Sequence, residues 1–388
     1  MDDGVPTEYR VLFLLPELFR HAGGIERFNR DLLRAVGEGG TGVRGLALVL
    51  NDDSEGQGLP ESLRVIPCAR GQLRTLWQVS FALQAVWRAW RFRPHVVFCG
   101  HANFLALAWL LKSIFGVEYV TMLHGIEAWG LDGALVRKAL AGSRKVLCTT
   151  PHTVERVRKS CGLNASQMGI LSCAVDGEKF VPRPKSEELQ RRYSLQGNRV
   201  LLTVSRLSPE DRYKGHATVL RALTRLLPSR PDLRYLIVGQ GEYAEELKAQ
   251  AQQMGISEQV IFAGPVAETE LVDYYNLCDV FVMPSKGEGF GIVYLEALAC
   301  GRPVIAGNQD GSVHALLEGR AGLLVDPDDT QAVADGIKHV LEGKVDRNLL
   351  DSAFLRTNIL ANYGFESFRE RVAGLFRELR AATSATAN

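Results

Sequence analysis

The segment PSKGEGFGIVYLEALACG, residues 284–301, places a strand end, a glycine-rich turn and a helix start in immediate succession. Gly287, Gly289 and Gly291 permit positive φ angles and a close approach of the backbone to a ligand. The next amides lie at the expected helix N-terminus, where free N–H groups and the helix dipole favour phosphate oxygens. These amides belong to Phe290, Gly291, Ile292 and Val293. The segment therefore predicts a phosphate site.

Two carboxylates flank this group of amides. Glu288 lies in the turn, and Glu296 lies about a turn and a half into the helix. Carboxylate oxygens accept hydrogen bonds, which suits the hydroxyl groups of a sugar. The pair predicts a site that holds one hydroxylated group on each side of a phosphate. On spacing alone, a strand-to-helix turn with a favourably charged first turn explains these residues equally well.

The EGFG start with a second glutamate eight residues later resembles a motif of the retaining GT-B glycosyltransferases. This family, glycosyltransferase family 4 or "glycosyl transferases group 1", includes sucrose-phosphate synthases and bacterial mannosyl- and glucosyltransferases. The resemblance covers nearly the whole chain, because further motifs follow in the family's order. These motifs are HAGGIERFNRDL, LHGIE, VSRL, RYKGH, VGQGE and FAGPV.

The resemblance implies the transfer of a hexose-type sugar, with retention of its anomeric configuration, from a UDP- or GDP-linked donor. The acceptor would be a hydroxyl group of a carbohydrate or a lipid-linked molecule, in polysaccharide, glycolipid or other glycoconjugate synthesis. The implied architecture is GT-B, with two Rossmann-like domains that face each other across a cleft. The second domain would bind the donor and the first the acceptor.

The resemblance also implies roles for single residues. His124 in LHGIE would lie near the reacting sugar and Glu288 beside it, which makes both candidate catalytic residues, whereas Glu296 would bind the ribose. A histidine between a strand end and a glycine is otherwise a hydrogen-bonded structural residue more often than a catalytic one. The donor-binding candidates are Gly23, Gly24, Arg206, Lys214, Gly239, Val266, Phe290, Gly291, Ile292 and Glu296.

The two cations among these candidates also have a physical rationale. A diphosphate leaving group gains negative charge as the glycosidic bond breaks, so Arg206 and Lys214 would stabilise the transition state more than the ground state. They would replace the metal ion that other transferases use, and we expect no metal and no other cofactor. Asp326 and Asp328 have the DxD spacing of a metal-dependent class, but their position before a helix favours a turn and a cap.

One segment departs from the family's pattern. Many relatives have a GGxPE-like sequence after the strand that ends near Ala306, whereas this chain has GNQDGSVHAL. The roles of Asp310 and Gly311 are therefore left open.

Composition limits the classes of function. The 388 residues are too many for one ordinary core and fit two domains. Lys+Arg 45 against Asp+Glu 44 give a formal net charge of +1, so the chain has no global field that attracts nucleic acid. We expect no nucleic-acid partner, and any bound anion must be held locally.

Several features predict a cytoplasmic protein, either free in solution or peripheral on the inner membrane face. The start MDDGVPTEYR is polar and acidic, which is the wrong order for a secretory signal, so we expect the mature protein to begin near Met1. The longest apolar stretch, roughly 104–115, is shorter than the ~20 residues that span a bilayer. The seven cysteines are scattered without CxxC pairs, which favours free buried thiols.

The segment RGQLRTLWQVSFALQAVWRAWRFR, residues 70–93, interleaves aromatic residues with arginines. A basic amphipathic helix of this kind can lie in an anionic membrane interface, which would suit a lipid-linked acceptor. The alternative is a domain helix that packs its apolar face on a sheet while its arginines are solvated. The pattern favours this second interpretation.

Short apolar runs alternate with helix-like segments in both halves of the chain, which predicts two doubly wound α/β domains. The strands are expected at 11–15, 46–50, 96–99, 119–123 and 145–148, then at 200–204, 235–238, 260–263, 280–283, 303–306 and 323–325. The expected divisions are an acceptor-side domain over 1–181, a linker over 182–198, a donor domain over 199–348 and a helical tail over 349–388. The pattern leaves open whether the tail returns to the first domain.

Two other classes of function compete with sugar transfer. One is a nucleotide-sugar epimerase or hydrolase on the same fold, and the other is a non-catalytic protein that binds sugar nucleotides. A decayed site would be expected to have lost some of Arg206, Lys214, Glu288 and Glu296, and all four are present.

Overall fold

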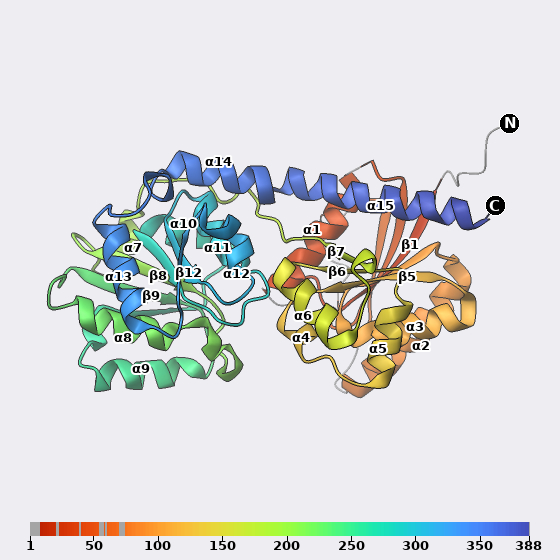
Figure 1. Cartoon of the computed structure of the whole chain (residues 1–388), viewed down its shortest axis with the longest axis horizontal. Coiled ribbons are helices and arrows are strands. Elements are labelled where there is room, and N and C mark those ends of the chain that lie inside the picture. The colour runs from red at the N-terminus through yellow and green to blue at the C-terminus, as the bar shows by residue number, and fades with distance from the viewer. Residues whose placement is uncertain are drawn as a thin grey trace. The chain divides into compact units, whose positions relative to one another are not determined.

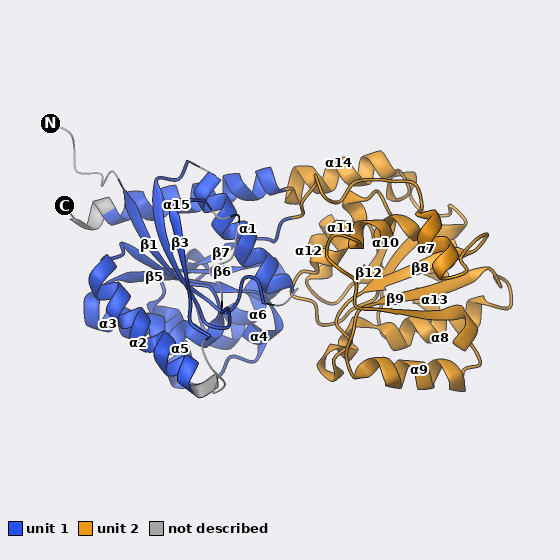
Figure 2. Ribbon diagram, turned by 180° about the vertical axis from the view of Figure 1, so that it is seen from behind, with its two compact units in different colours: residues 1–174, 365–388 blue, residues 175–364 orange. Residues whose placement is uncertain are grey.

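The computed structural model shows two α/β units, each built around one parallel sheet (Figures 1 and 2). The described residues are 8–20, 23–38, 40–53, 58, 60–69 and 74–387. Unit 1 comprises residues 1–174 and 365–388, and unit 2 comprises residues 175–364. The predicted pair of Rossmann-like domains is confirmed.

Unit 1 contains a seven-stranded sheet in the order β3-β2-β1-β4-β5-β6-β7, with all pairings parallel. Its strands are β1 (Tyr9–Leu15), β2 (Val43–Val49), β3 (Leu63–Pro67), β4 (Val96–Cys99), β5 (Glu118–Leu123), β6 (Lys145–Cys148) and β7 (Met168–Ile170). Its helices are α1 (Gly24–Glu38), α2 (Arg74–Phe92), α3 (Leu105–Phe115), α4 (Ile126–Trp129), α5 (Ala134–Gly142), α6 (Pro151–Cys161) and α15 (Phe365–Ala387). Strands covered on both faces need continuous apolar runs, and β1 (YRVLFLL) is one.

Unit 2 contains a six-stranded parallel sheet in the order β10-β9-β8-β11-β12-β13. Its strands are β8 (Arg199–Val204), β9 (Leu233–Val238), β10 (Val260–Gly264), β11 (Val280–Met283), β12 (Val304–Gly307) and β13 (Leu323–Val325). Its helices are α7 (Glu187–Arg192), α8 (His216–Leu226), α9 (Tyr243–Gln253), α10 (Leu271–Leu277), α11 (Ile292–Ala299), α12 (Ser312–Ala315), α13 (Thr330–Leu341) and α14 (Ser352–Tyr363).

Each sheet has a point where the strand order reverses. In unit 1 this point lies between β1 and β4, and in unit 2 it lies between β8 and β11. Loops that leave the carboxyl ends of two such strands diverge to opposite faces, and the crevice they leave is where open α/β sheets bind ligands. The loops after β8 and β11 carry Arg206 and Glu288, so the topology brings the two motifs to one edge.

Two strands, β3 and β7, lie outside the sequence prediction. They are the two edge strands of the sheet in unit 1. Edge strands are only partly covered, and the residues of β3 and β7 alternate between buried and partly exposed or are largely uncovered. Their sequences, LRVIP and MGI, therefore lack the continuous apolar run that identifies a central strand.

The first domain boundary differs from the expected one. The chain passes from unit 1 to unit 2 after Ala174, so the expected linker over 182–198 belongs to unit 2. That segment contains α7, and Lys185 forms an ion pair with Asp279 at 2.8 Å. The segment is thus part of unit 2, although both of its prolines and most of its charged side chains are exposed.

The helical tail divides at Gly364. Helix α14 belongs to unit 2, whereas α15 belongs to unit 1 and packs on α1. The rings of Phe28 and Phe368 meet edge to face at 5.7 Å, and Lys145 pairs with Glu378 at 2.6 Å. The C-terminal helix therefore completes the core of the N-terminal unit.

Helix α2 accounts for most of the arginine- and tryptophan-rich segment, whose residues 70–73 lie outside the described part. Phe81, Ala85 and Ala89 are buried in the core of unit 1, as expected for a domain helix. The other interpretation, contact with a membrane, stays a hypothesis. Across the part of the chain that the structure describes, no helix combines the length and the apolar character needed to cross a bilayer.

All seven cysteines are buried free thiols, as the sequence predicts. The expected acidic start of the chain lies outside the described residues up to residue 7.

Candidate active site

The centre of the candidate site is an ion-pair cluster at the carboxyl ends of β8 and β11. The ammonium of Lys214 lies 3.3 Å from Oε1 of Glu288 and 3.7 Å from Oδ1 of Asp211. A guanidinium nitrogen of Arg206 lies 3.5 Å from the same oxygen of Asp211. The structure therefore brings together three residues that the sequence placed in different motifs.

Asp211 is a member of this cluster that sequence reasoning missed. Its side chain is buried, and it accepts a hydrogen bond from the hydroxyl of Ser208 at 2.6 Å. Burial by itself would raise the pKa of Asp211, but Lys214, Ser208 and Arg206 together hold that pKa below its ordinary value. The carboxylate is thus ionised, and it orients both cations. Its position three residues before Lys214 was the available signal.

The two cations differ in exposure. The side chain of Arg206 is 74% exposed and that of Lys214 is 12% exposed. Lys214 has three N–H donors, so it can contact both carboxylates and still donate a hydrogen bond to a phosphate oxygen. Arg206 makes the long contact to Asp211 and presents most of its guanidinium group to solvent.

Asp310 holds the turn that carries Glu288 by hydrogen bonds. Oδ2 of Asp310 accepts hydrogen bonds from the Glu288 amide and from the Ser285 hydroxyl, each at 2.7 Å. Oδ1 accepts bonds from the amide and the hydroxyl of Ser312, the amide at 3.0 Å. Burial raises the pKa of Asp310, although these hydrogen bonds oppose the rise.

Gly311 holds the same turn by a backbone hydrogen bond. Its amide donates to the carbonyl oxygen of Glu288 at 2.9 Å. Both backbone polar groups of Glu288 are therefore fixed by the loop after β12. The segment that departs from the family's pattern thus positions the turn, which resolves the structural place of Asp310 and Gly311.

The first turn of α11 follows directly. Gly291 has φ +90°, a conformation that favours glycine, and a Cβ atom there would lie 2.3 Å from the ring of Tyr294. Phe290 is buried, with its ring edge to face against Tyr363 at 5.3 Å. Ile292 begins the helix. The amides of a first helical turn have no intrahelical acceptor, so they are suited to a phosphate. That a phosphate binds there stays a prediction.

Glu296 lies inside this helix and is buried. The hydroxyl of Tyr275, from α10, donates a hydrogen bond to its carboxylate. A buried carboxylate held by a tyrosine is well oriented to accept further hydrogen bonds from a ribose. That role stays a prediction.

The loops after β9 and β10 meet beside the loop that carries Arg206. Gly239 has φ +140°, and a Cβ atom there would lie 1.8 Å from the carbonyl oxygen of Ser205. The Gly239 amide donates to the carbonyl of Gly264 at 2.9 Å, two residues before Val266. Val266 is half-buried. The loops that carry Gly239 and Val266, two of the predicted donor-binding residues, thus lie beside the loop of Arg206 within unit 2.

His216 is a further residue that sequence reasoning missed. Its Nε2 lies 2.9 Å from the hydroxyl of Ser205, and burial, together with the nearby Lys214, lowers its pKa to about 3. The imidazole is therefore neutral at physiological pH. It fixes the start of α8 beside Lys214 without adding charge to the cluster.

In unit 1, His124 stands at the carboxyl end of β5. Its Nε2 lies 3.1 Å from the carbonyl oxygen of Gly100, and its ring packs edge to face on Phe28 at 4.9 Å. Burial lowers the pKa of His124, with a smaller contribution of the same sign from His101. A carbonyl only accepts, so Nε2 carries the proton and Nδ1 is the remaining acceptor.

Two further side chains fix the loop around His124. A carboxylate oxygen of Glu127 accepts bonds from the amides of His124 and Gly125, and Thr149 donates to the carbonyl of His124 at 2.8 Å. Helix α1, which begins at Gly24, contributes the Phe28 ring. The carbonyl oxygen of Gly23 accepts a hydrogen bond from the Arg27 amide at the start of that helix. Contact of Gly23, Gly24 and His124 with the substrate stays a prediction.

The DxD match forms a turn. Asp326 accepts hydrogen bonds from the Asp328 amide at 2.9 Å and from Gln309, and Asp328 pairs with Lys286 at 2.6 Å. The described residues contain no group of three or more His, Cys, Asp or Glu side chains that would hold a metal ion. The expectation of metal-independent transfer stays a prediction.

Comparisons with known proteins agree with this arrangement. A family model described as Glycosyltransferase Family 4 matches residues 22–179, and one described as glycosyl transferases group 1 matches residues 185–353. A GDP-mannose-dependent alpha-(1-6)-phosphatidylinositol monomannoside mannosyltransferase of Mycolicibacterium smegmatis is 37% identical over 258 residues, which are 63% of this chain and 66% of the relative. The enzyme of that name from Mycobacterium tuberculosis is 32% identical over 294 residues, or 72% and 75% of the two chains.

Solved structures with the same fold include HepE of Anabaena in complex with UDP, with a TM-score of 0.77, 19% identity and coverage of 95% of this chain and 100% of that one. Sucrose-phosphate synthase of Thermosynechococcus elongatus gives a TM-score of 0.76 at 20% identity, over 97% and 100% of the chains. At these identities the likeness establishes the fold. With family models matching most of both units, the chain belongs to the group 1, family 4 glycosyltransferases and is an enzyme that transfers a sugar from a nucleotide-sugar donor.

Proposed function

We propose that this enzyme is a retaining, metal-independent hexosyltransferase that moves a mannosyl group from GDP-mannose to a hydroxyl of a lipid-linked acceptor. The choice of donor and acceptor class follows the names of its relatives, which are GDP-mannose-dependent and act on a phosphatidylinositol mannoside. The EGFG motif and its second glutamate support the retaining reaction by resemblance.

The observation that carries the proposal is the Lys214 ammonium, held 3.3 Å from Glu288 and 3.7 Å from Asp211 at the end of the central strands. The donor diphosphate would contact Lys214, Arg206 and the first amides of α11. Its mannosyl group would then lie beside Glu288. Charge that develops on the leaving diphosphate would meet cations already fixed by Asp211, so little reorganisation accompanies the reaction.

The proposed reaction needs no base from the enzyme. The acceptor oxygen forms a bond to the anomeric carbon on the face from which the bond to the diphosphate oxygen breaks. The acceptor proton passes to an oxygen of the leaving diphosphate, which departs as GDP. Glu288 would stabilise the positive charge that develops at the anomeric carbon. His124, neutral and with Nδ1 free to accept, would orient a hydroxyl of the sugar or the acceptor.

The test is product analysis with purified enzyme, GDP-mannose or UDP-glucose, and a phosphatidylinositol acceptor. We expect an acceptor-dependent glycolipid with GDP-mannose, in which NMR shows the anomeric configuration of the donor. Free mannose or a second nucleotide sugar formed without acceptor would indicate a hydrolase or an epimerase. Tight GDP binding without any product would indicate a non-catalytic binding protein.

A further inference from the structure

Three polar side chains follow two neighbouring strands of the unit 1 sheet. His101 comes directly after Gly100 at the end of β4, and His124 and Glu127 follow β5, which pairs with β4. The strand order reverses between β1 and β4, and open α/β sheets bind ligands at such a point. The proposed reaction gives His124 a task and gives none to His101. The hydrogen bonds of these side chains show what a ligand at this edge must offer.

Gly100 sets the position of His101. The Gly100 amide donates to the carbonyl oxygen of Leu14, in β1, at 2.9 Å. A Cβ atom at Gly100 would lie 2.5 Å from Cδ2 of Leu15, so no larger residue fits between the two strands. The thiol of Cys99 donates to the carbonyl oxygen of His101 at 3.3 Å. His101 therefore leaves the sheet from a fixed point beside β1.

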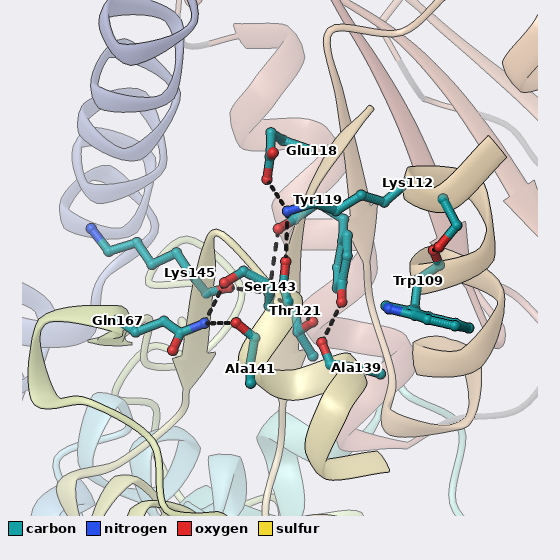
Figure 3. Close-up of polar contacts among 12 residues, drawn as sticks. Trp109, Lys112, Glu118, Tyr119, Thr121, Ala139, Ala141, Ser143, Lys145 and Gln167 are labelled. Atoms are coloured by element: carbon teal, nitrogen blue, oxygen red, sulfur yellow. Dashed lines mark hydrogen bonds and ion pairs between the residues drawn. The ribbon is translucent and has the colours of Figure 1, made fainter. Parts of the chain in front are cut away.

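Strand β5, which places the other two side chains, is fixed by a polar network (Figure 3). The ammonium of Lys112, in α3, donates to Glu118 at 2.8 Å. The hydroxyl of Tyr119 donates to the carbonyl oxygen of Ala139, in α5. These bonds tie β5 to both helices. The groups that follow the strand are therefore held in place before any ligand binds.

The bonds of His101 determine which ring nitrogen carries its proton. Nδ1 accepts a hydrogen bond from the amide of Asn103 at 3.1 Å. Burial lowers the pKa of His101, although Glu127 opposes the fall, so the ring is neutral at physiological pH. A neutral imidazole whose Nδ1 accepts has its proton on Nε2. Among the described residues nothing accepts a bond from this Nε2, so the fold leaves a hydrogen-bond donor unused.

His124 and Glu127 supply the complementary acceptors. Nε2 of His124 is bonded to the carbonyl oxygen of Gly100, which leaves the lone pair of Nδ1. Oε1 of Glu127 accepts from the amides of His124 and Gly125, and in the described part of the chain no group donates to Oε2. The charge of Glu127 acts on both imidazoles, because it opposes the fall in the pKa of each. One donor and two acceptors are thus neighbours.

This set of groups matches two adjacent hydroxyl groups. A hydroxyl oxygen accepts a hydrogen bond and its proton donates another. One hydroxyl can accept from Nε2 of His101 and donate to Glu127, while a neighbouring hydroxyl donates to Nδ1 of His124. A molecule with a single hydroxyl leaves one of these groups without a partner, which costs free energy. A phosphate or a carboxylate would be repelled by the charge of Glu127.

We propose that His101 and Glu127, together with His124, bind a polyhydroxylated ring of the acceptor substrate through two adjacent hydroxyl groups. His101 donates a hydrogen bond to the ring, and Glu127 and His124 accept from it. The ring is thereby oriented at the carboxyl edge of the unit 1 sheet. The inference rests on the proposed transfer reaction, whose acceptor substrate it narrows to a sugar or polyol ring, and it is independent of the nucleotide sugar that is used.

The first test replaces His101 by asparagine. An asparagine oxygen keeps the bond from the Asn103 amide, as in a helix cap, but the side chain lacks the Nε2–H donor. With GDP-mannose and phosphatidylinositol, His101→Asn should raise the KM of the acceptor substrate about 3- to 10-fold and leave kcat within about twofold. His101→Ala should raise that KM equally and also lower the melting temperature, because it removes the cap. His339→Asn, at an exposed histidine of α13, is the matched control.

The second test needs no transfer activity. Saturation-transfer NMR of the full chain with GDP compares myo-inositol and methyl α-mannoside, which have adjacent hydroxyl groups, with cyclohexanol, a ring with one. We expect binding of the two polyols and much weaker binding of cyclohexanol. His101→Asn should weaken the binding of the polyols about 3- to 10-fold, whereas His339→Asn should leave it unchanged. GDP titration of each variant verifies that unit 2 is intact.

An unchanged KM of the acceptor substrate in His101→Asn would overturn the proposal, because a purely structural role is preserved by the cap. Cyclohexanol that binds as tightly as the polyols, or a wild type that binds neither polyol, would overturn it as well. If the wild type transfers sugar to no acceptor, the proposed function fails. The NMR comparison then still decides whether the edge of unit 1 binds a polyol through His101.

Discussion

Replacement of Asp310 by asparagine should damage the site although the side chain touches no substrate in the proposed reaction. Each carboxylate oxygen accepts one backbone N–H, that of Glu288 at 2.7 Å and that of Ser312 at 3.0 Å. An amide has one oxygen only, so in either orientation its NH₂ group faces one of these backbone donors. A buried donor without an acceptor costs about 1–3 kcal/mol.

For a unit of this size, that loss lowers the melting temperature by about 2–12 °C. Displacement of the Glu288 amide should also reduce kcat by about 10- to 100-fold, because small displacements of catalytic groups are costly. Calorimetry and steady-state kinetics measure the two effects. Asp335→Asn, at an exposed carboxylate that accepts from Gln331, is the matched control and should change stability by less than about 0.5 kcal/mol.

The pH dependence provides a sharper check. The pKa of Asp310 is raised above 3.8 in the folded chain, so as the pH rises past 3.8 the unfolded chain loses this proton first. The folded state then holds more protons, and the stability contributed by this group falls with pH until the folded pKa is passed. Asparagine does not titrate, so the variant should lack this fall. A variant as stable and active as the wild type, or a stability difference independent of pH across that interval, would contradict this role of Asp310.

Further predictions concern the residues that bind the nucleotide-sugar donor. Lys214→Ala should lower kcat/KM by about 10- to 150-fold, the loss of a charge-assisted bond, and Arg206→Ala should cost less because its side chain is 74% exposed; near-normal turnover in both would remove the phosphate assignment. Glu288→Gln should mainly depress kcat, whereas Glu296→Gln should mainly weaken GDP binding, and titration with GDP that gave the reverse order would exchange the two roles. Activity should survive EDTA, and a loss that manganese or magnesium restores would show a metal requirement.

The fold and the motifs were predictable because their signals are local. Central strands read as continuous apolar runs, and Glu288 and Lys214 stand in contiguous motifs that resemble a known family. The ion pair between these two side chains gives that resemblance a geometric basis. Their roles in the reaction stay predictions until they are measured.

The features that the sequence did not reveal depend on contacts between particular side chains, and two of these contacts join residues far apart in the chain. Asp310 accepts a hydrogen bond from the amide of Glu288, 22 positions earlier in the chain, and no local pattern predicts that bond. In the sequence Asp211 resembles an ordinary surface residue. The structure shows that Arg206 and Lys214 share its carboxylate. The linker prediction failed for the same reason, since the charge of Lys185 finds its partner in Asp279.

In the proposed function, Lys214 and its carboxylate partners bind a nucleotide diphosphate sugar for transfer. Single-turnover kinetics with GDP-mannose and a lipid acceptor, with wild type and Lys214→Ala compared at saturating donor, test it most directly. We expect a glycolipid of retained configuration from the wild type and a chemical step slowed at least about tenfold in the variant, because the lysine acts on developing charge. An unchanged chemical step in Lys214→Ala, or a product of inverted configuration, would contradict it.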